Sequence, residues 1–280
     1  MAAMTTSAST KSPPGVALVG AGSMGGAMLR GWIDAKSINP KTSCVFDPAI
    51  SDDLKRLADQ IGIAINPMQR ACVADIAIIA VKPQKAGTIL PAFSETLRDR
   101  VIVSVMAGSA VPTISGYLGG ANKIIRAMPN LPALYRAGAT GLFASNTISE
   151  QEREQVTVLM DVIGDVVWVE SESEIDFVTA ISGSGPAYFL LLVEALEEAG
   201  TTLGLSPEVA ERLARATLSG AGAVIDNDQR SAAQLRKMVT SPGGTTEAAL
   251  REFDGDKGEL RELVKRAAAA AAARAKELAG

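Results

Sequence analysis

The stretch VALVGAGSMGG, residues 16–26, decides the fold of the first half of the chain. An apolar strand pattern runs into glycines at the GxGxxG spacing, and a helical pattern follows at once. The first glycine permits a tight turn, the second lets backbone N–H groups approach a diphosphate, and the third allows close strand–helix packing. A plain glycine-rich connection is the alternative, but the strand–helix frame favours dinucleotide binding, with candidate contacts at Gly20, Gly22, Ser23, Met24 and Gly25.

The second predicted strand ends at Asp47, in the sequence VFDP. A carboxylate at this position normally accepts the ribose 2′-hydroxyl of NAD and repels the 2′-phosphate of NADP. Asp47 could instead be a turn residue before Pro48. The sequence leaves both interpretations open.

Three further predicted strands end in the motifs AVKPQ, SVMAG and RAMPN. The carboxyl ends of parallel strands form the edge at which ligands of open α/β sheets bind. One such motif alone would be ordinary loop chemistry, but three in succession predict the wall of a site. The candidate cofactor contacts here are Ala80, Val81, Lys82, Pro83, Ala107, Gly108 and Asn130.

The pattern of the chain changes near residue 170. Residues 15–170 alternate β-branched runs with helical patterns, one of them a helix over 84–97, which predicts a Rossmann-type parallel sheet covered on both faces. Residues 171–280 contain only helical patterns and predict an all-helical domain. Residues 1–14 are rich in Ser, Thr and Pro and predict a disordered leader. The fold class is therefore α/β with an added all-α domain.

Composition excludes several classes of function. The net charge of −4 comes without a basic stripe, which argues against nucleic-acid binding. The absence of histidine excludes a Ser-His-Asp site and a His-ligated zinc, and we expect no metal. The two cysteines, Cys44 and Cys72, show no ligand spacing and are expected to be free thiols, although they could approach each other in space. No secretory signal is present, and the apolar run AYFLLLV is too short to span a bilayer, so we expect a cytoplasmic protein without membrane contact.

The helix predicted from Pro186 is apolar on most of its faces. Such a helix is either central in its own domain or pressed against another subunit. The sequence alone does not decide between a buried core helix and a dimer interface.

The stretch SPGGTTEAAL, residues 241–250, places Gly243 and Gly244 before a helix. Unpaired N–H groups at a helix start suit a carboxylate ligand, and the hydroxyls of Ser241, Thr245 and Thr246 could add donors. The alternative is that Thr245 or Thr246 is simply an N-cap.

Taken together, VGAGSMGGAM, AVKPQ, SVMAG, RAMPN, SGSGPAYF and VTSPGGTTEAAL resemble the Δ1-pyrroline-5-carboxylate reductase family of proline biosynthesis. The resemblance runs from about residue 15 to the end of the chain, and the last motif is the most specific. It implies a Rossmann domain followed by a helical domain that interlocks with a partner's to form a homodimer. Many members of the family assemble such dimers into a decamer.

The resemblance also implies the chemistry. NADPH or NADH delivers hydride to the C=N carbon of a cyclic imine that carries a carboxylate, and L-proline is formed. Thr246 matches the threonine that hydrogen-bonds the ring nitrogen, and is the catalytic candidate. The substrate-binding candidates are Ser241, Gly243, Gly244, Thr245, Thr246, Gly185 and Pro186, with the SPGGTT loop supplied by the partner subunit.

One feature departs from the family pattern. Many members carry a small polar residue and an arginine after the second strand, whereas this chain carries Asp47, which favours NADH on physical grounds. Two other functions remain alternatives at this stage. One is a beta-hydroxyacid dehydrogenase-like oxidoreductase, and the other is a dinucleotide-binding sensor without catalysis.

Overall fold

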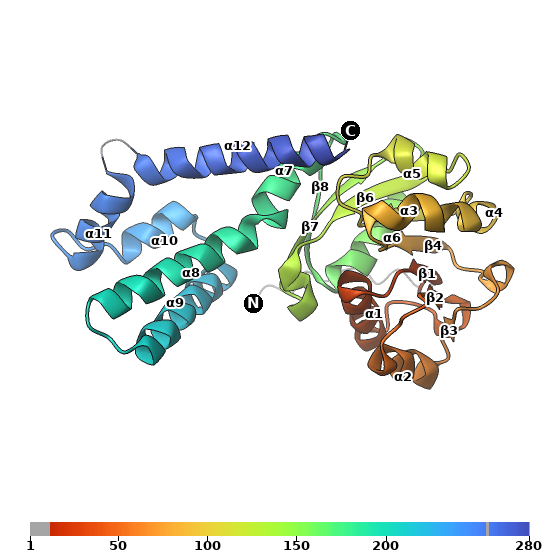
Figure 1. Ribbon diagram of the computed structural model, residues 1–280, viewed down its shortest axis with the longest axis horizontal. Coiled ribbons are helices and arrows are strands. Elements are labelled where there is room, and N and C mark those ends of the chain that lie inside the picture. The colour runs from red at the N-terminus through yellow and green to blue at the C-terminus, as the bar shows by residue number, and fades with distance from the viewer. Residues whose placement is uncertain (1–11, 256–257, 280) are drawn as a thin grey trace. The chain divides into compact units, whose positions relative to one another are not determined.

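The computed structural model describes residues 12–255 and 258–279, and the chain divides into two compact units (Figure 1). Unit 1 runs to Gly183 and includes the end of the chain from Arg274, and unit 2 comprises Ser184–Ala273. Residues 1–11, most of the predicted leader, lie outside the described residues.

Unit 1 is built on an eight-stranded sheet within the described residues, in the order β3-β2-β1-β4-β5-β6-β7-β8. Its strands are β1 (Val16–Val19), β2 (Cys44–Phe46), β3 (Ala64–Ile65), β4 (Ile76–Ile79), β5 (Val101–Ser104), β6 (Ile124–Met128), β7 (Gly138–Ala144) and β8 (Gly164–Trp168). The sheet is parallel as predicted except at one place, where β7 pairs with β6 in the antiparallel direction. Residues 129–137 are too short for the crossover that a parallel pair needs, so the chain turns back beside β6.

Helices cover both faces of this sheet, as the strand–helix alternation predicts. The alternating side chains of β1 show this directly, since Val16 and Leu18 join one buried cluster while Ala17 and Val19 join the other. The first cluster lies under α1 (Ser23–Ala35), α2 (Asp52–Ile61) and α6 (Glu150–Asp161). The second lies under α3 (Pro83–Ile89), the 3₁₀ turn η3 (Leu90–Phe93), α4 (Ser94–Leu97) and α5 (Val111–Tyr117).

The helix predicted over residues 84–97 is broken into α3, η3 and α4. Pro91 lies in the first turn of η3 and has no N–H to continue the helical ladder, which accounts for the break. Three other 3₁₀ turns connect elements of unit 1: η1 (Pro40–Thr42), η2 (Gln69–Ala71) and η4 (Leu131–Tyr135).

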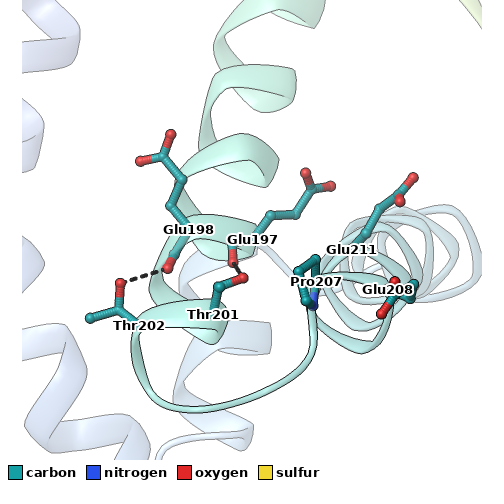
Figure 2. Close-up of a pocket in the computed structure, with 7 residues that line it drawn as sticks. All are labelled: Glu197, Glu198, Thr201, Thr202, Pro207, Glu208 and Glu211. Carbon is teal, nitrogen blue, oxygen red and sulfur yellow. Dashed lines mark hydrogen bonds between the residues drawn. The ribbon is translucent and has the colours of Figure 1, made fainter.

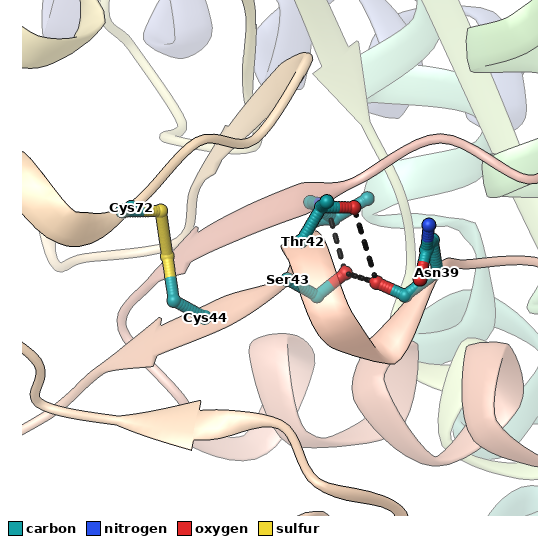
Figure 3. Close-up of a disulfide and its surroundings, with 6 residues drawn as sticks. Asn39, Thr42, Ser43, Cys44 and Cys72 are labelled. Carbon is teal, nitrogen blue, oxygen red and sulfur yellow. Dashed lines mark hydrogen bonds between the residues drawn. A yellow bond between two sulfur atoms is a disulfide. The ribbon is translucent and has the colours of Figure 1, made fainter.

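The two cysteines are paired, so the expectation of free thiols is wrong. Cys44, in β2, forms a disulfide with Cys72, which follows η2 (Figure 3). The two residues are 28 positions apart and become neighbours because the chain after β3 returns to enter β4. Beside Cys44, the Ser43 hydroxyl donates to the Asn39 carbonyl at 2.7 Å and accepts from the Val16 N–H at 3.0 Å.

A short helix joins the sheet to the helical half of the chain. It consists of α7 (Glu174–Val178) and one π-helical turn, η5 (Thr179–Gly183). Gly141 of β7 has no side chain, and a Cβ placed there would lie 2.5 Å from Cγ1 of Val178. This glycine therefore lets α7 lie directly on the sheet.

Unit 2 is built from helices alone in its described residues. They are α8 (Gly185–Thr202), α9 (Pro207–Asn227), α10 (Ala232–Met238), α11 (Thr245–Asp254) and α12 (Glu259–Ala279), the end of α12 being grouped with unit 1. The close approach of α8 and α9 is set by Gly200, where an added Cβ would lie 3.0 Å from Cβ of Ala210.

The apolar side chains of α8 are largely exposed in the single chain, so this helix is not a buried core helix of its own unit. The exposed side chains are Tyr188, Phe189, Leu190, Leu191, Leu192 and Leu196, while Val193 is buried. The continuous helical stretch Glu174–Thr202, which is longer than the run AYFLLLV, is long and apolar enough to cross a membrane by length and composition alone. Length and composition do not distinguish such a helix from one that packs against another protein surface.

Candidate functional site

The glycine turn between β1 and α1 has the geometry that its sequence predicts. Gly20 has φ +95°, and a Cβ there would lie 2.7 Å from the carbonyl oxygen of Ala80. A Cβ on Gly25 would clash with the carbonyl of Gly20, so the helix can approach the strand only with glycine at this position. Gly22, by contrast, faces open space, with no atom within 4 Å of an added Cβ.

The N-terminus of α1 is open to an anion. Gly22 is the N-cap, and no side chain caps the first turn. The N–H groups of Ser23 and Met24 therefore point out of the helix beside the open space at Gly22, where the helix dipole favours negative charge. These features fit the diphosphate of a dinucleotide.

Asp47 follows β2 and directs its carboxylate at this turn. Oδ2 accepts from the Ala21 N–H at 2.6 Å and Oδ1 accepts from the Ala49 N–H at 2.8 Å. Asn66 has a left-handed conformation with φ +47°, and its Oδ1 accepts from the Asp47 N–H while its Nδ2 donates to the Asp47 carbonyl, each at 2.9 Å. The side chain of Asn66 thus fixes the position of Asp47. Asn66 was not predicted as a functional residue, because a single asparagine between two short strands is a weak signal.

The other predicted wall residues lie at the same carboxyl edge of the sheet. Lys82 is the N-cap of α3, Pro83 lies in its first turn, and the Lys82 side chain is exposed. Ala107 is exposed in the loop after β5, and Gly108 next to it has φ +65°. Because β1, β4 and β5 are parallel neighbours, their ends bring the glycine turn, residues 80–83 and residues 107–108 to one edge.

Asn130 lies after β6 and is 8% exposed. Its Nδ2 donates to the carbonyl oxygen of Ser182 at 3.0 Å, and its Oδ1 accepts from the Ala139 N–H at 2.9 Å. The amide is therefore engaged with the protein's own backbone rather than held free at the surface.

A buried ion pair that the sequence analysis missed lies beside the same strand. Arg126 of β6 is 5% exposed and donates from Nη1 to Oε1 of Glu172 at 3.0 Å. The same oxygen accepts from the Val111 N–H, at the start of α5, at 2.7 Å. Glu172 thereby joins β6, α5 and the segment before α7. The RAMPN motif contains the arginine, but nothing in the sequence indicates its partner 46 residues away.

The second glycine bend, in unit 2, opens α11. Gly243 has φ +71° and Gly244 is the N-cap, with no side-chain cap. The N–H groups of the two glycines are themselves engaged within the chain. Gly243 N–H donates to Oε2 of Glu247 at 2.8 Å, and Gly244 N–H donates to the Ser241 carbonyl at 3.0 Å. The groups left open are the N–H groups at the start of α11, beginning at Thr245.

Neither threonine caps this helix, so the N-cap alternative for Thr245 and Thr246 is wrong. Thr245 is the first helical residue, and Thr246 is half-buried one position later. Within the described part of the chain, neither hydroxyl has a hydrogen-bond partner, so both are available to a ligand. Of the SGSGP segment, Gly185 is buried at the start of α8 and Pro186 is half-buried.

A surface hollow lies elsewhere, between α8 and α9 (Figure 2). Four carboxylates line it, those of Glu197, Glu198, Glu208 and Glu211. The Thr201 and Thr202 hydroxyls beside them bond to carbonyls of their own helix. A concentration of negative charge repels a diphosphate or a carboxylate, so this hollow is not the predicted site. Across the described residues, no group of three or more acidic or cysteine side chains could hold a metal ion.

The fold and the glycine turn define a class: this is a nicotinamide-dependent oxidoreductase with a Rossmann-type domain. Residues 15–108 match the family model described as NADP oxidoreductase, coenzyme F420-dependent. Residues 172–278 match the model described as pyrroline-5-carboxylate reductase dimerisation.

The chain belongs to the pyrroline-5-carboxylate reductase family. It is 38% identical to the pyrroline-5-carboxylate reductase of Pseudomonas aeruginosa over 96% of this chain and 98% of the relative. The solved pyrroline-5-carboxylate reductase of Coxiella burnetii is 38% identical, with a TM-score of 0.87 over 95% of this chain and 99% of that one. That of Plasmodium falciparum, solved with NADP bound, is 25% identical, with a TM-score of 0.79 over 96% and 99%. The comparisons do not support the dehydrogenase-like or sensor alternatives.

Proposed function

We propose that this protein reduces 1-pyrroline-5-carboxylate to L-proline with NADPH or NADH. The observation that carries the proposal is the bend at Gly243 and Gly244, which opens α11 with uncapped N–H groups and two unpartnered threonine hydroxyls. A helix start of this kind suits a small carboxylate, and the same chain carries a turn suited to a diphosphate. Membership of the family supplies the substrate class.

The residues present fit a dinucleotide at the first glycine turn. Ser23 and Met24 would bind the diphosphate through their N–H groups, and Asp47 would accept ribose hydroxyls. Residues 80–83 and 107–108 would line its path toward the reacting ring. The bound nicotinamide supplies the hydride. The chain contributes orientation and exclusion of water, which account for much of catalysis when two bound reactants meet.

At the second bend, the N–H groups of Thr245 and Thr246 and the Ser241 hydroxyl would hold the substrate carboxylate. We propose that the Thr246 hydroxyl donates to or accepts from the ring nitrogen and so orients the C=N bond. Gly185 and Pro186 would form the opposite wall. No acidic side chain is needed, because an imine can arrive already protonated.

A second copy of this chain is the partner that we propose for the exposed face of α8. The face carries six large apolar side chains from residue 188 to residue 196, and soluble monomers rarely expose such a patch. The match of residues 172–278 to a dimerisation model supports this choice. We propose a homodimer as the basic unit, assembled into a decamer as in many family members, and a cytoplasmic location.

The decisive experiment is initial-rate kinetics with 1-pyrroline-5-carboxylate and with 3-hydroxy acids, each with NADPH and NADH. We expect turnover of the imine and none of the hydroxy acids. Replacing Thr246 by Ala should lower kcat/KM by roughly tenfold or more, as expected for a lost polar contact in an enclosed site.

The matched control is Thr202→Ala, in the same unit, because the Thr202 hydroxyl bonds only to the Glu198 carbonyl of its own helix at 2.9 Å. This variant should retain the wild-type rate. Binding of NADPH without imine turnover would contradict the proposed reaction, and a Thr246→Ala variant with the wild-type kcat/KM would contradict the role of its hydroxyl.

The oligomeric state can be tested by light scattering after size-exclusion chromatography. Leu191→Lys places a charge on the exposed face of α8 and should release monomers. Val158→Lys, at an exposed position of α6 in unit 1, is the control and should not change the mass. A wild-type protein that stays monomeric at micromolar concentration would contradict the homodimer.

A further inference from the structure

The carbonyl of Ser182 lacks its normal helical donors. In an α-helix this oxygen would accept from residue 186, but that residue is Pro186, which has no N–H. In a π-helix it would accept from residue 187, but the N–H of Ala187 donates to the Ser184 carbonyl at 3.0 Å. A carbonyl without a partner at a half-buried position costs free energy comparable to a lost hydrogen bond.

Asn130 supplies the missing donor from the edge of the sheet. Its Nδ2 lies 3.0 Å from the Ser182 oxygen, and the asparagine is 8% exposed. The other end of the amide is fixed by the Ala139 N–H at 2.9 Å, which sets the orientation of the side chain. One asparagine therefore connects the end of β6, the start of β7 and the π-helical turn η5.

Packing around the same turn reinforces this connection. A Cβ on Gly183 would lie 2.9 Å from Cε of Met128, so the turn lies directly against the end of β6. A π-helical turn is an uncommon feature that persists where a local demand stabilises it, often at functional sites. Here the demand is identifiable, since the proline that begins α8 removes a donor and Asn130 replaces it.

We propose that Asn130 is a positioning residue, which holds the Ser182–Pro186 segment in place for the imine. This inference rests on the proposed function, in which Gly185 and Pro186 line the substrate pocket. It assigns to Asn130 a role other than the direct cofactor contact that its motif predicts. Asn130 therefore acts on the orientation of the substrate and its C=N bond rather than on binding of the dinucleotide.

The test is the isosteric change Asn130→Asp. The carboxylate still accepts from Ala139 but cannot donate to Ser182, and it repels that carbonyl. We expect kcat/KM for the imine to fall by about tenfold, while KM for NADPH or NADH changes by less than about twofold. Asn130→Leu keeps the shape without a buried charge and should give the same pattern if the aspartate variant folds poorly. Asn122→Asp, at an exposed position before β6, is the matched control and should behave as wild type.

A second measurement does not depend on activity. Hydrogen exchange followed by mass spectrometry should show faster exchange of the amides of residues 179–185 in Asn130→Asp, with the strands of the sheet unchanged. In a Pro186→Ala background residue 186 regains an N–H for the Ser182 carbonyl. The same Asn130→Asp change should then have a smaller effect on exchange, which is the coupling expected of a shared acceptor.

Several outcomes would overturn the role of Asn130. They are unchanged exchange at residues 179–185, an equal effect in the two backgrounds, or a loss confined to the KM of the dinucleotide. If the wild-type protein does not turn over the imine, the proposed reaction fails, but the exchange experiment still decides whether Asn130 holds the π-helical turn.

Discussion

The carboxylate of Asp47 accepts a hydrogen bond from the backbone N–H of Ala21, with 2.6 Å between Oδ2 and the nitrogen. This contact ties the end of β2 to the glycine turn, although the two residues are 26 positions apart. Each carboxylate oxygen can accept more than one hydrogen bond, so capacity remains for ribose hydroxyls. A negative charge therefore lies beside the turn, and under the proposed binding of the dinucleotide it would face a 2′-phosphate.

Replacing Asp47 by Asn should shift the preference between the two cofactors. The amide oxygen can still accept from Ala21, but the charge is gone, so repulsion of a 2′-phosphate should fall. We expect KM for NADPH to decrease by roughly tenfold. Charge repulsion of a few kcal/mol or less near a protein surface is enough for a change of this size. In the wild type, KM for NADH should be comparable to or below that for NADPH, measured by initial rates. Asp52→Asn, in the exposed first turn of α2, is the control, and a strong wild-type preference for NADPH would contradict this view of Asp47.

Two glycines of the same turn should differ in how replacement by Ala affects stability. A Cβ on Gly22 meets nothing within 4 Å, so Gly22→Ala should keep its Tm while filling the space meant for the diphosphate and weakening NAD(P)H binding. A Cβ on Gly25 meets the Gly20 carbonyl, so Gly25→Ala should lower both Tm and binding. Thermal melts and cofactor titrations by fluorescence measure the two effects. A Gly22→Ala variant that binds NAD(P)H normally would exclude the diphosphate from this turn.

The Cys44–Cys72 disulfide should make stability depend on reductant. It closes a loop of 28 residues, for which chain entropy gives a stabilisation of about 3–4 kcal/mol. Adding a phosphine reductant should lower the urea midpoint of the wild type accordingly. Cys72→Ser should already have the lower midpoint and should not respond to reductant. Two titratable thiols in the untreated native protein would argue against the bond.

The ion pair of Arg126 and Glu172 should matter to stability because the arginine is buried. Glu172→Ala leaves the Arg126 charge without its partner. We expect the free energy of unfolding to fall by about 2–3 kcal/mol. This is less than the usual cost of breaking a buried pair, because Glu172 is partly exposed. Arg126→Met and Glu172→Met combined should lose less than the sum of these two single Met changes, measured against wild type. Urea unfolding of the four proteins gives the comparison, and strict additivity would contradict a direct pair.

Stability at acid pH should depend on Glu152. Burial alone would raise the pKa of this carboxyl, but hydrogen bonds from Lys123 and from Ser149 outweigh burial and hold the pKa below its ordinary value of 4.5. Ionised Glu152 therefore stabilises the fold fully above about pH 4.5, and this contribution is lost as pH falls through the lower folded-state pKa. Urea unfolding of wild type and Glu152→Gln should differ at pH 6 and converge toward pH 3. A difference that is independent of pH would show that ionisation is not the cause.

Local patterns predicted much of this structure because the forces that they report act over short distances. The GxGxxG turn works through residues at most five positions apart, and its geometry at Gly20 and Gly25 follows from the sequence. The alternation of β1 between two cores also follows from a period of two. Both domains were therefore predictable without any knowledge of long-range contacts.

The contacts that the sequence did not predict join distant residues. Asn66 binds Asp47 across 19 positions, Arg126 binds Glu172 across 46, and Asn130 binds Ser182 across 52. The reversal of β7 depends on the length of a connection rather than on propensity. One signal was available and unused: Pro186 deprives the carbonyl four residues earlier of its donor, so some side chain had to compensate.

The uncovered apolar face of α8 has a consequence for how the protein must be made. Unit 2 buries few of its own large side chains, so in the proposed homodimer its order would depend on meeting a second copy of the chain. That encounter is bimolecular and its rate rises with the amount of chain present, whereas collapse of the Rossmann half is a first-order process. At low concentration, newly synthesised chains would thus have a folded Rossmann domain and an incompletely ordered helical domain. Aggregation and proteolysis would compete with assembly in that state.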